Sequence, residues 1–182
     1  MAEYILSKDQ LRYAREHSES ATILNEARNV RRYSAPSDGI SIFLSHKHDE
    51  VAVLEDVICM LKSLKVNVYV DWLDEGMPKQ TCGETALRIK KKIKECKKFI
   101  LLATEGAIAS KWCNWELGYG DAHKYWENIA IMPITEKKDD IFSGSEYLQI
   151  YPVIKSAYRH ITDEVYVEFR GKRVSLVEWL KN

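Results

Sequence analysis

Between residues 40 and 134, short apolar runs of strand length alternate with longer segments whose apolar residues recur at helical spacing. This alternation predicts βα units around a parallel sheet. The strands are almost continuously apolar, which is typical of a sheet that helices cover on both faces. The expected strands are 40–44, 66–70, 99–103 and 129–134, and the expected helices are 50–65, 84–97 and 111–126.

The segment before this alternation has a different composition. Residues 7–32 lack Pro and Gly and are rich in Arg, Glu, Ala and Leu, which predicts one or two helices. A turn-forming cluster at 34–39 then marks a boundary. We therefore expect an N-terminal helical extension over 1–37, separable from a sheet domain over 38–182.

The C-terminal part, 136–182, is less regular. Residues 164–169 alternate between polar and apolar types, which predicts a half-exposed strand. Ser175 and Glu178 have the spacing of a capping box, which predicts a short terminal helix.

Composition excludes several function classes. The 27 basic and 27 acidic residues cancel, which argues against a global attraction to nucleic acid or to an anionic membrane. No apolar stretch approaches the roughly 20 residues that span a bilayer, and the N-terminus carries charges where a signal peptide needs an apolar stretch. The four cysteines form no CxxC pair, so we expect reduced thiols in a cytoplasmic protein.

Open parallel sheets bind ligands at the carboxyl ends of their strands, and polar, acidic and aromatic residues gather at these positions here. A helix that begins near Ser110 places Trp112 and Glu116 on one face, at positions i and i+4. Such a carboxylate is often only a surface charge that favours the helix dipole, and such a tryptophan often closes the edge of a core. On spacing alone, a ligand site and these structural roles both stay open.

Other chemistries have less support in the sequence. There is no GK[ST] of a Walker loop and no GxGxxG. His46 and His48 lack a third metal ligand at helical spacing, and Cys113 lacks an evident histidine partner for a nucleophilic thiol. The lysine-rich segment 90–98 has the composition of a nucleic-acid-binding surface, but a solvated helix face is its simpler interpretation.

Three runs, in this order and spacing, resemble the motifs of a TIR (Toll/interleukin receptor) domain: IFLSHKHDE at 42–50, VYVDWLDEGMP at 68–78 and SKWCNWELGYG at 110–120. The similarity covers about residues 38–135. The third run, with W-C-x-x-E-L, resembles the third-helix motif of TIR domains that cleave NAD. The resemblance implies an α/β, flavodoxin-like fold with a central parallel sheet in the order 2-1-3-4-5, flanked by helices.

The resemblance also implies the site. Glu116 matches the glutamate that NAD cleavage needs, and Trp112 matches a residue that packs in the same site. Ser45 and His46 match first-loop positions, and Asp71 matches the acidic end of the second strand. Breaking the nicotinamide–ribose bond creates an oxocarbenium-like transition state, which a carboxylate in an aromatic pocket stabilises. We expect Trp72 in the next loop to supply part of that pocket.

A small TIR protein of this kind resembles the TIR component of bacterial Thoeris anti-phage defence, which makes a nucleotide signal from NAD. This resemblance implies that NAD is the substrate, with no cofactor and no metal. It also implies other TIR protomers as partners on activation, a phage-derived trigger, and a separate effector that reads the product. The alternative is a non-catalytic TIR scaffold for protein–protein assembly. We expect no nucleic-acid or membrane partner.

Overall fold

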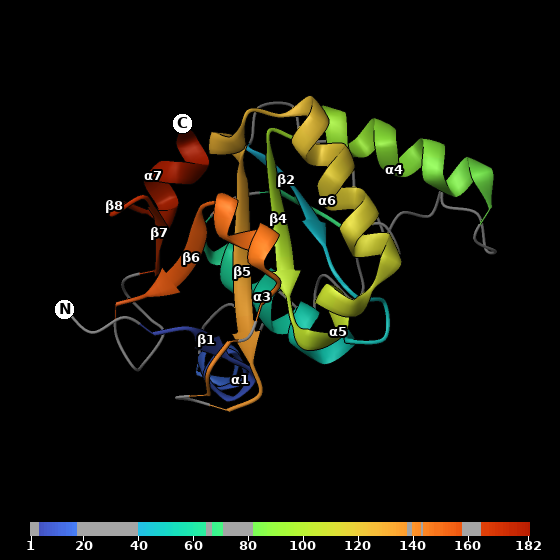
Figure 1. Cartoon of the computed structure of the whole chain (residues 1–182). Helices are drawn as coiled ribbons and strands as arrows, with labels where there is room; N and C mark the ends of the chain where they lie inside the picture. Colours follow the sequence, from blue (N-terminus) through green and yellow to red (C-terminus); the bar gives the residue numbers. More distant parts are fainter. Residues whose placement is uncertain are drawn as a thin grey trace.

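The computed structural model describes residues 4–17, 40–64, 67–70, 82–137, 140–142, 144–157 and 165–182. These residues form a sheet flanked by helices on both faces (Figure 1). The strands are β1 (Leu6–Ser7), β2 (Ser41–Ser45), β3 (Asn67–Tyr69), β4 (Lys98–Ala103), β5 (Ile129–Thr135), β6 (Val153–Ser156), β7 (Val165–Phe169) and β8 (Lys172–Ser175). The helices are α1 (Lys8–Glu16), α3 (Val51–Ser63), α4 (Gly83–Glu95), α5 (Glu105–Ala109), α6 (Lys111–His123) and α7 (Leu176–Lys181), with the short 3-10 helices η2 (Trp126–Asn128) and η3 (Glu146–Ile150).

The sheet has the order β3-β2-β4-β5-β6-β7-β8, and β1 pairs with β5 beside this path. The pairs from β3 to β6 are all parallel. Numbered along the chain from β2, these five strands have the order 2-1-3-4-5, which confirms the expected flavodoxin-like sheet. β7 and β8 extend it with antiparallel pairs, an extension that the expected order does not contain.

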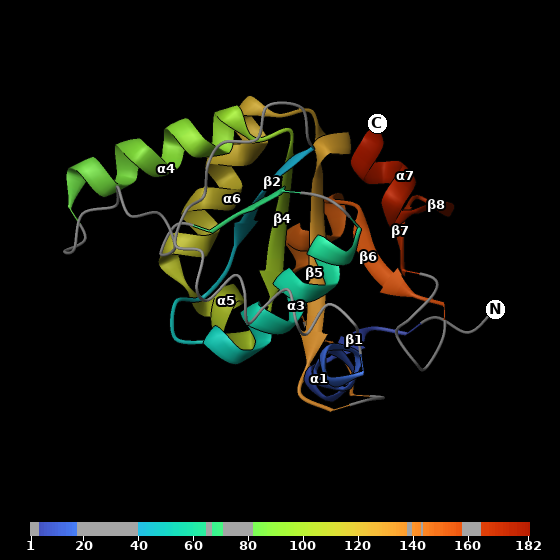
Figure 2. The ribbon, with the colours of Figure 1, turned by 180° about the vertical axis from the view of Figure 1, so that it is seen from behind.

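Alternate residues of each strand enter two separate cores, because successive side chains point to opposite faces of a sheet. On β2, Ile42 and Leu44 enter the core beneath α1, α3 and α7. Figure 2 views the sheet from this face, with α1 and α3 in front of it. Phe43 enters the opposite core, beneath α4 and α6. Both faces are therefore buried, as the continuous apolar runs predict.

Close packing sets the distance between α6 and the sheet. A Cβ atom on Gly120 of α6 would lie 3.2 Å from the Phe99 ring of β4, so this position has little room for a larger side chain. Phe99 stacks on Phe43, with ring centroids 5.5 Å apart. The helix that carries the third motif therefore lies directly against the two central strands.

The N-terminal segment differs from the expected separable extension in its described part, residues 4–17. Leu6 and Leu11 are fully buried in the core that α3 covers, and β1 pairs in parallel with the end of β5. A capping box between Ser7 and Gln10 begins α1. These residues are thus part of the sheet domain, and the remaining positions of the expected helices lie outside the described residues.

The C-terminal part contains both elements that its sequence pattern predicts. The expected strand at 164–169 appears as β7, and the Ser175 hydroxyl accepts a hydrogen bond from the Glu178 amide at 3.1 Å to begin α7. This confirms the expected terminal helix. No helix of the described residues is long and apolar enough to cross a membrane.

Candidate active site

The last residue of β2 contacts the third motif through a side-chain hydrogen bond. The Ser45 hydroxyl donates to Oε2 of Glu116 at 2.5 Å. Both side chains are buried, with exposed fractions of 1% for Ser45 and 4% for Glu116. Interpreting Glu116 as a surface charge at the start of a helix is therefore wrong, because α6 turns this carboxylate inward onto the carboxyl end of β2.

A second contact joins the same two segments. The Cys113 thiol of α6 donates to the backbone carbonyl of His46 at 3.2 Å. His46 is itself buried, and its Nδ1 lies 3.1 Å from the Leu44 carbonyl oxygen. A carbonyl only accepts hydrogen bonds, so Nδ1 of His46 carries a proton. These contacts fix the first residues of the loop after β2 against α6.

Local capping explains where α6 begins. The Ser110 hydroxyl accepts a hydrogen bond from the Cys113 amide at 3.3 Å, as an N-cap residue does. The Asn114 amide group donates to the carbonyls of Ile108 and Ser110, and the Tyr147 hydroxyl donates to Asn114 Oδ1. These hydrogen bonds hold the turn between α5 and α6 at several points. They therefore fix the rotation of α6 about its own axis, so that Cys113 and Glu116 both face β2.

Trp112 lies at the surface one helical turn before Glu116. Its exposed fraction is 36%, and its ring packs edge-on against Trp115, with centroids 5.2 Å apart and an angle of 86° between the planes. Trp115 in turn stacks on Tyr119. Trp112 is therefore the exposed end of an aromatic row along α6, not a core residue.

Asp71 and Trp72, the two remaining residues of the expected site, lie outside the described residues. The structure thus brings Ser45, His46 and Glu116 together, and Trp112 lies on the same helix as Glu116.

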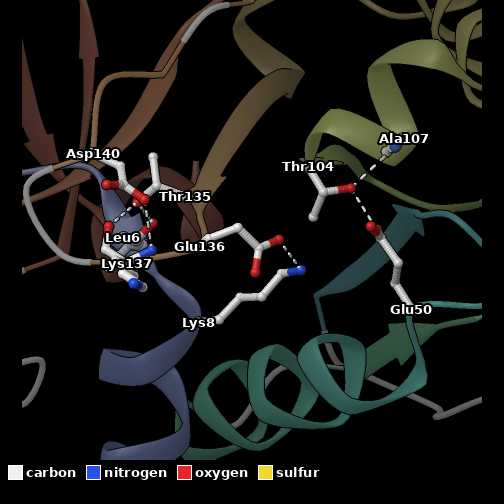
Figure 3. Close-up of polar contacts among 9 residues, drawn as sticks. All are labelled: Leu6, Lys8, Glu50, Thr104, Ala107, Thr135, Glu136, Lys137 and Asp140. Carbon is white, nitrogen blue, oxygen red and sulfur yellow. Dashed lines mark hydrogen bonds and ion pairs between the residues drawn. The ribbon is translucent and has the colours of Figure 1, made fainter.

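A second carboxylate lies at this edge of the sheet, that of Glu50, which was not among the expected site residues. Glu50 Oε2 accepts a hydrogen bond from the Thr104 hydroxyl, which also accepts one from the Ala107 amide as the cap of α5 (Figure 3). Thr104 follows β4 directly and is buried. Two features of the sequence could have indicated this contact. Glu50 lies at the start of an expected helix, and Thr104 lies at the end of an expected strand.

The alternative chemistries gain no support. Among the described residues, no group of three or more His, Cys, Asp and Glu side chains is placed to hold a metal ion. Cys113 is buried, with its thiol turned toward a backbone carbonyl. The segment 90–98 is only partly a solvated face: Lys90 lies over the Trp115 and Tyr119 rings, and Lys98 is buried within β4.

This arrangement places a carboxylate in a largely water-free position beside a hydroxyl, at the edge of the sheet where parallel α/β folds bind ligands. A buried carboxylate interacts strongly with a positive charge that develops beside it, because water does not screen the interaction. The geometry suits the stabilisation of a cationic transition state better than it suits a metal centre or a thiol nucleophile.

Comparisons with known proteins agree with the fold. The family model described as "TIR domain" matches residues 42–162. A Bacillus cereus (strain MSX-D12) protein named "Probable 3' cyclic ADP-D-ribose synthase ThsB'" is 30% identical over 143 residues, which cover 71% of this chain and 73% of that protein. A Cytobacillus dafuensis protein named "Putative cyclic ADP-D-ribose synthase TIR2" is 26% identical over 81 residues, or 43% of this chain and 21% of that protein.

The family match spans the strands β2 to β6 and the helices between them, and so includes Ser45, His46, Trp112 and Glu116. Three structural observations do not depend on that match. They are the sheet order, the helices on both faces of the sheet, and the contact between the first and third motifs. Fold and sequence therefore lead to one conclusion: this chain belongs to the TIR domain family.

Proposed function

We propose that this chain breaks the nicotinamide–ribose bond of NAD and forms a cyclic ADP-ribose. The names of two relatives, both given as cyclic ADP-D-ribose synthases, support this proposal. The single observation that carries it is the buried Glu116 carboxylate beside the Ser45 hydroxyl. A scaffold that only binds other proteins has no evident need for a buried carboxylate at this position.

The proposed chemistry balances without a cofactor. The bond between ribose C1′ and the nicotinamide nitrogen breaks, and its electron pair stays with the nicotinamide, which leaves as a neutral molecule. The ribose is left as an oxocarbenium-like cation, which the Glu116 carboxylate stabilises. A hydroxyl of the same ADP-ribose then attacks C1′, and the proton that it releases passes to Glu116 and from there to solvent.

The other site residues have supporting roles in this proposal. Ser45 is a positioning residue, because its hydroxyl orients the Glu116 carboxylate. His46 holds the loop after β2, and Trp112 supplies an aromatic surface at the rim for the nicotinamide or adenine ring. We also propose Asp71 and Trp72, which follow β3 in the sequence, as substrate-binding residues.

Exclusion of water decides the product. Water at C1′ gives linear ADP-ribose, whereas a hydroxyl of the substrate gives the cyclic molecule. Both routes release one nicotinamide for each NAD, so nicotinamide reports on the bond cleavage and mass spectrometry of the remaining nucleotide reports on cyclisation.

The test is incubation of the purified protein with NAD, followed by separation of nicotinamide and nucleotide products. We expect Glu116→Gln to keep the fold and to lower turnover by about 10²–10³, because this change removes only the charge. Glu178→Gln is the matched control, since Glu178 is an exposed carboxylate in the first turn of α7. Normal turnover by folded Glu116→Gln protein would overturn the role of Glu116, and no turnover by wild type under activating conditions would favour the scaffold.

The wider setting is a proposal of the same kind. We propose that the protein acts in the cytoplasm in anti-phage defence, that other copies of the chain assemble with it on activation in response to a phage-derived trigger, and that a separate effector reads the nucleotide. Light scattering with and without lysate from infected cells tests the assembly, and transfer of the purified nucleotide to candidate effectors tests the last step.

A further inference from the structure

A buried lysine adjoins a pocket on the opposite face of the sheet from Glu116. Lys98, the first residue of β4, has an exposed fraction of 1%. It pairs in register with Ile42, whose side chain belongs to the core beneath α3 and α7, whereas the neighbouring Phe43 belongs to the core beneath α6. The Lys98 side chain is therefore separated from the Ser45–Glu116 contact by the sheet itself.

Among the described residues, the Lys98 ammonium has polar and aromatic neighbours but no carboxylate counter-ion in contact with it. It donates to Asn128 Oδ1 at 2.6 Å and lies 4.6 Å above the centroid of the Trp179 ring. In the part of the chain that the structure describes, no carboxylate oxygen lies within 4.0 Å of Nζ. A buried charge without a partner is costly, so folded proteins usually pair such groups.

The groups around Lys98 also make its positive charge unfavourable. Burial, together with the nearby ammonium groups of Lys97 and Lys124, lowers the pKa of Lys98 to about 8, and the Glu127 carboxylate opposes this shift. The amino end of β4 is thus locally positive although the chain as a whole is neutral.

The pocket beside this lysine has the size of a small-ligand site. Its volume is about 450 Å³, and Lys98, Tyr125, Glu127, Asn128, Val174 and Trp179 are among the residues that line it. Trp179 and Val174 supply apolar surface. The Trp179 ring is fixed, because its indole N–H donates to the Glu127 carbonyl at 2.7 Å. The wall is therefore preformed.

Two residues with hydrogen-bond donors, Lys98 and Asn128, line this pocket and contact each other. The Lys98 ammonium can only donate, so the Asn128 atom that faces it is the oxygen, and the Asn128 amide nitrogen is the second donor. A carboxylate has two acceptor oxygens and the opposite charge, so it matches this pair of donors.

We propose that this Lys98 pocket binds a small organic carboxylate, whose acidic group pairs with Lys98 and Asn128 and whose flat apolar body lies against Trp179. The bound carboxylate is then the counter-ion that the described residues do not provide for Lys98. The site is independent of the proposed NAD chemistry, which uses the other face of the sheet.

The test uses benzoate as the probe and benzamide as its uncharged analogue. Titration calorimetry of the full chain should show benzoate binding, with benzamide weaker by about tenfold or more, because it lacks the charge. In nitrogen–proton NMR spectra, the Trp179 indole signal should shift on addition of benzoate. Absence of benzoate binding, or equal binding of the two probes, overturns the proposal.

Two variants and one control locate the site. Lys98→Met should lower benzoate affinity by about tenfold or more, whereas Lys97→Met should change it by less than about threefold, since the Lys97 side chain donates to the Lys181 carbonyl instead. Asn128→Asp places an internal carboxylate beside Lys98 and should also weaken benzoate. Unchanged affinity in folded Lys98→Met and in Asn128→Asp overturns the site.

The pH dependence gives a readout that does not depend on folding of a variant. Only the ammonium form of Lys98 pairs with an anion, so benzoate affinity in the wild-type chain should fall as the pH rises from 7 to 9. Constant affinity over this interval contradicts the proposal. Glu116→Gln should leave benzoate binding unchanged, so that failure of the proposed NAD chemistry and failure of this site are separate results.

Discussion

The thiol of Cys113 donates to the backbone carbonyl of His46, and this contact joins α6 to the loop after β2 one helical turn away from the Ser45–Glu116 hydrogen bond. Two positions one turn apart on α6 thus hold the last residue of β2 and the first residue of the loop after it. The contact assigns Cys113 a structural role that a substitution series can separate from catalysis.

We expect Cys113→Ser to keep both the contact and the activity, because the hydroxyl donates to the same carbonyl. Cys113→Ala should lower the free energy of unfolding by about 1 kcal/mol through loss of the hydrogen bond and should reduce nicotinamide release less than Glu116→Gln does. Urea unfolding and nicotinamide release measure the two effects. Complete loss of activity in both folded variants would instead identify the thiol as a reacting group.

Trp112→Ala should act on substrate binding more than on stability. A tryptophan in a core costs roughly 3–5 kcal/mol on truncation, but Trp112 is 36% exposed and we expect a cost of about 1–2 kcal/mol. KM for NAD should rise, while Trp126→Ala, a change at another exposed tryptophan, should leave KM unaltered. A large drop in melting temperature with unchanged KM would show that Trp112 serves the fold alone.

Leu11→Ala should destabilise the whole domain by about 2–5 kcal/mol, because Leu11 is buried in the core shared with α3. The control is Tyr13→Ala on the same helix, where the side chain is 53% exposed. Thermal unfolding followed by circular dichroism measures both. If Leu11→Ala unfolds at the wild-type temperature, the N-terminal helix is a separable appendage after all.

Because of Asp56, we expect the free energy of unfolding to fall as the pH rises. Its carboxyl group is buried in α3, and burial raises its pKa to about 6, although the Arg15 guanidinium lies 2.9 Å away and opposes this effect. The folded state therefore holds this proton more tightly than the unfolded state. The resulting stabilisation is fully present below the unfolded pKa, near 4, and is lost as the pH rises through about 6.

Asp56→Asn removes this titration. The free energy of unfolding of the wild type should fall between pH 4 and 6 by up to about 3 kcal/mol relative to the variant. Urea unfolding at several pH values measures the difference. Parallel pH profiles for the two proteins would mean that Asp56 is as easily ionised in the folded state as in the unfolded one.

Alkylation should distinguish the four cysteines, all of which are free thiols in the structure. Hydrogen bonds from the Thr85 amide and hydroxyl lower the pKa of exposed Cys82, whereas burial raises the pKa of Cys96 to about 11. Because the thiolate is the reactive form, iodoacetamide should modify Cys82 first and Cys96 only after unfolding. Peptide mass spectrometry over time checks this order, and faster modification of Cys96 would contradict it.

The periodic part of the fold was predictable, and the short elements were not. Strands β2 to β5 follow from apolar runs, because each is buried on both faces. β1 has only two residues and β6 only four, so neither is long enough for a clear periodic signal. The capping sequence from Ser7 to Gln10 was a readable start for α1, but it did not indicate that the helix would pack on α3.

For the candidate site, the sequence indicated which residues to expect there, and packing decided how the described ones lie. Glu116 and Trp112 have the spacing of one helix face, yet one is buried and the other is at the rim, because α6 rests on β2 along the Cys113–Glu116 edge. Burial of Lys98 was not foreseeable, since a lysine at the end of a lysine-rich segment normally lies in solvent. Trp179 of α7 and Asn128 of η2 cover its ammonium group.

The parallel pairing of β1 with β5 has a consequence for how the chain folds while it is being made. Thr135 donates to the carbonyl of Leu6, 129 residues earlier in the sequence, so the first strand leaves the ribosome long before its partner exists. Until then Leu6 and Leu11 have no complete core to enter, and the nascent chain must carry them exposed. Contacts of such long sequence separation also slow the folding of an isolated chain. β1 and α1 are made before β5, yet they are therefore among the last parts of the domain to reach their native positions.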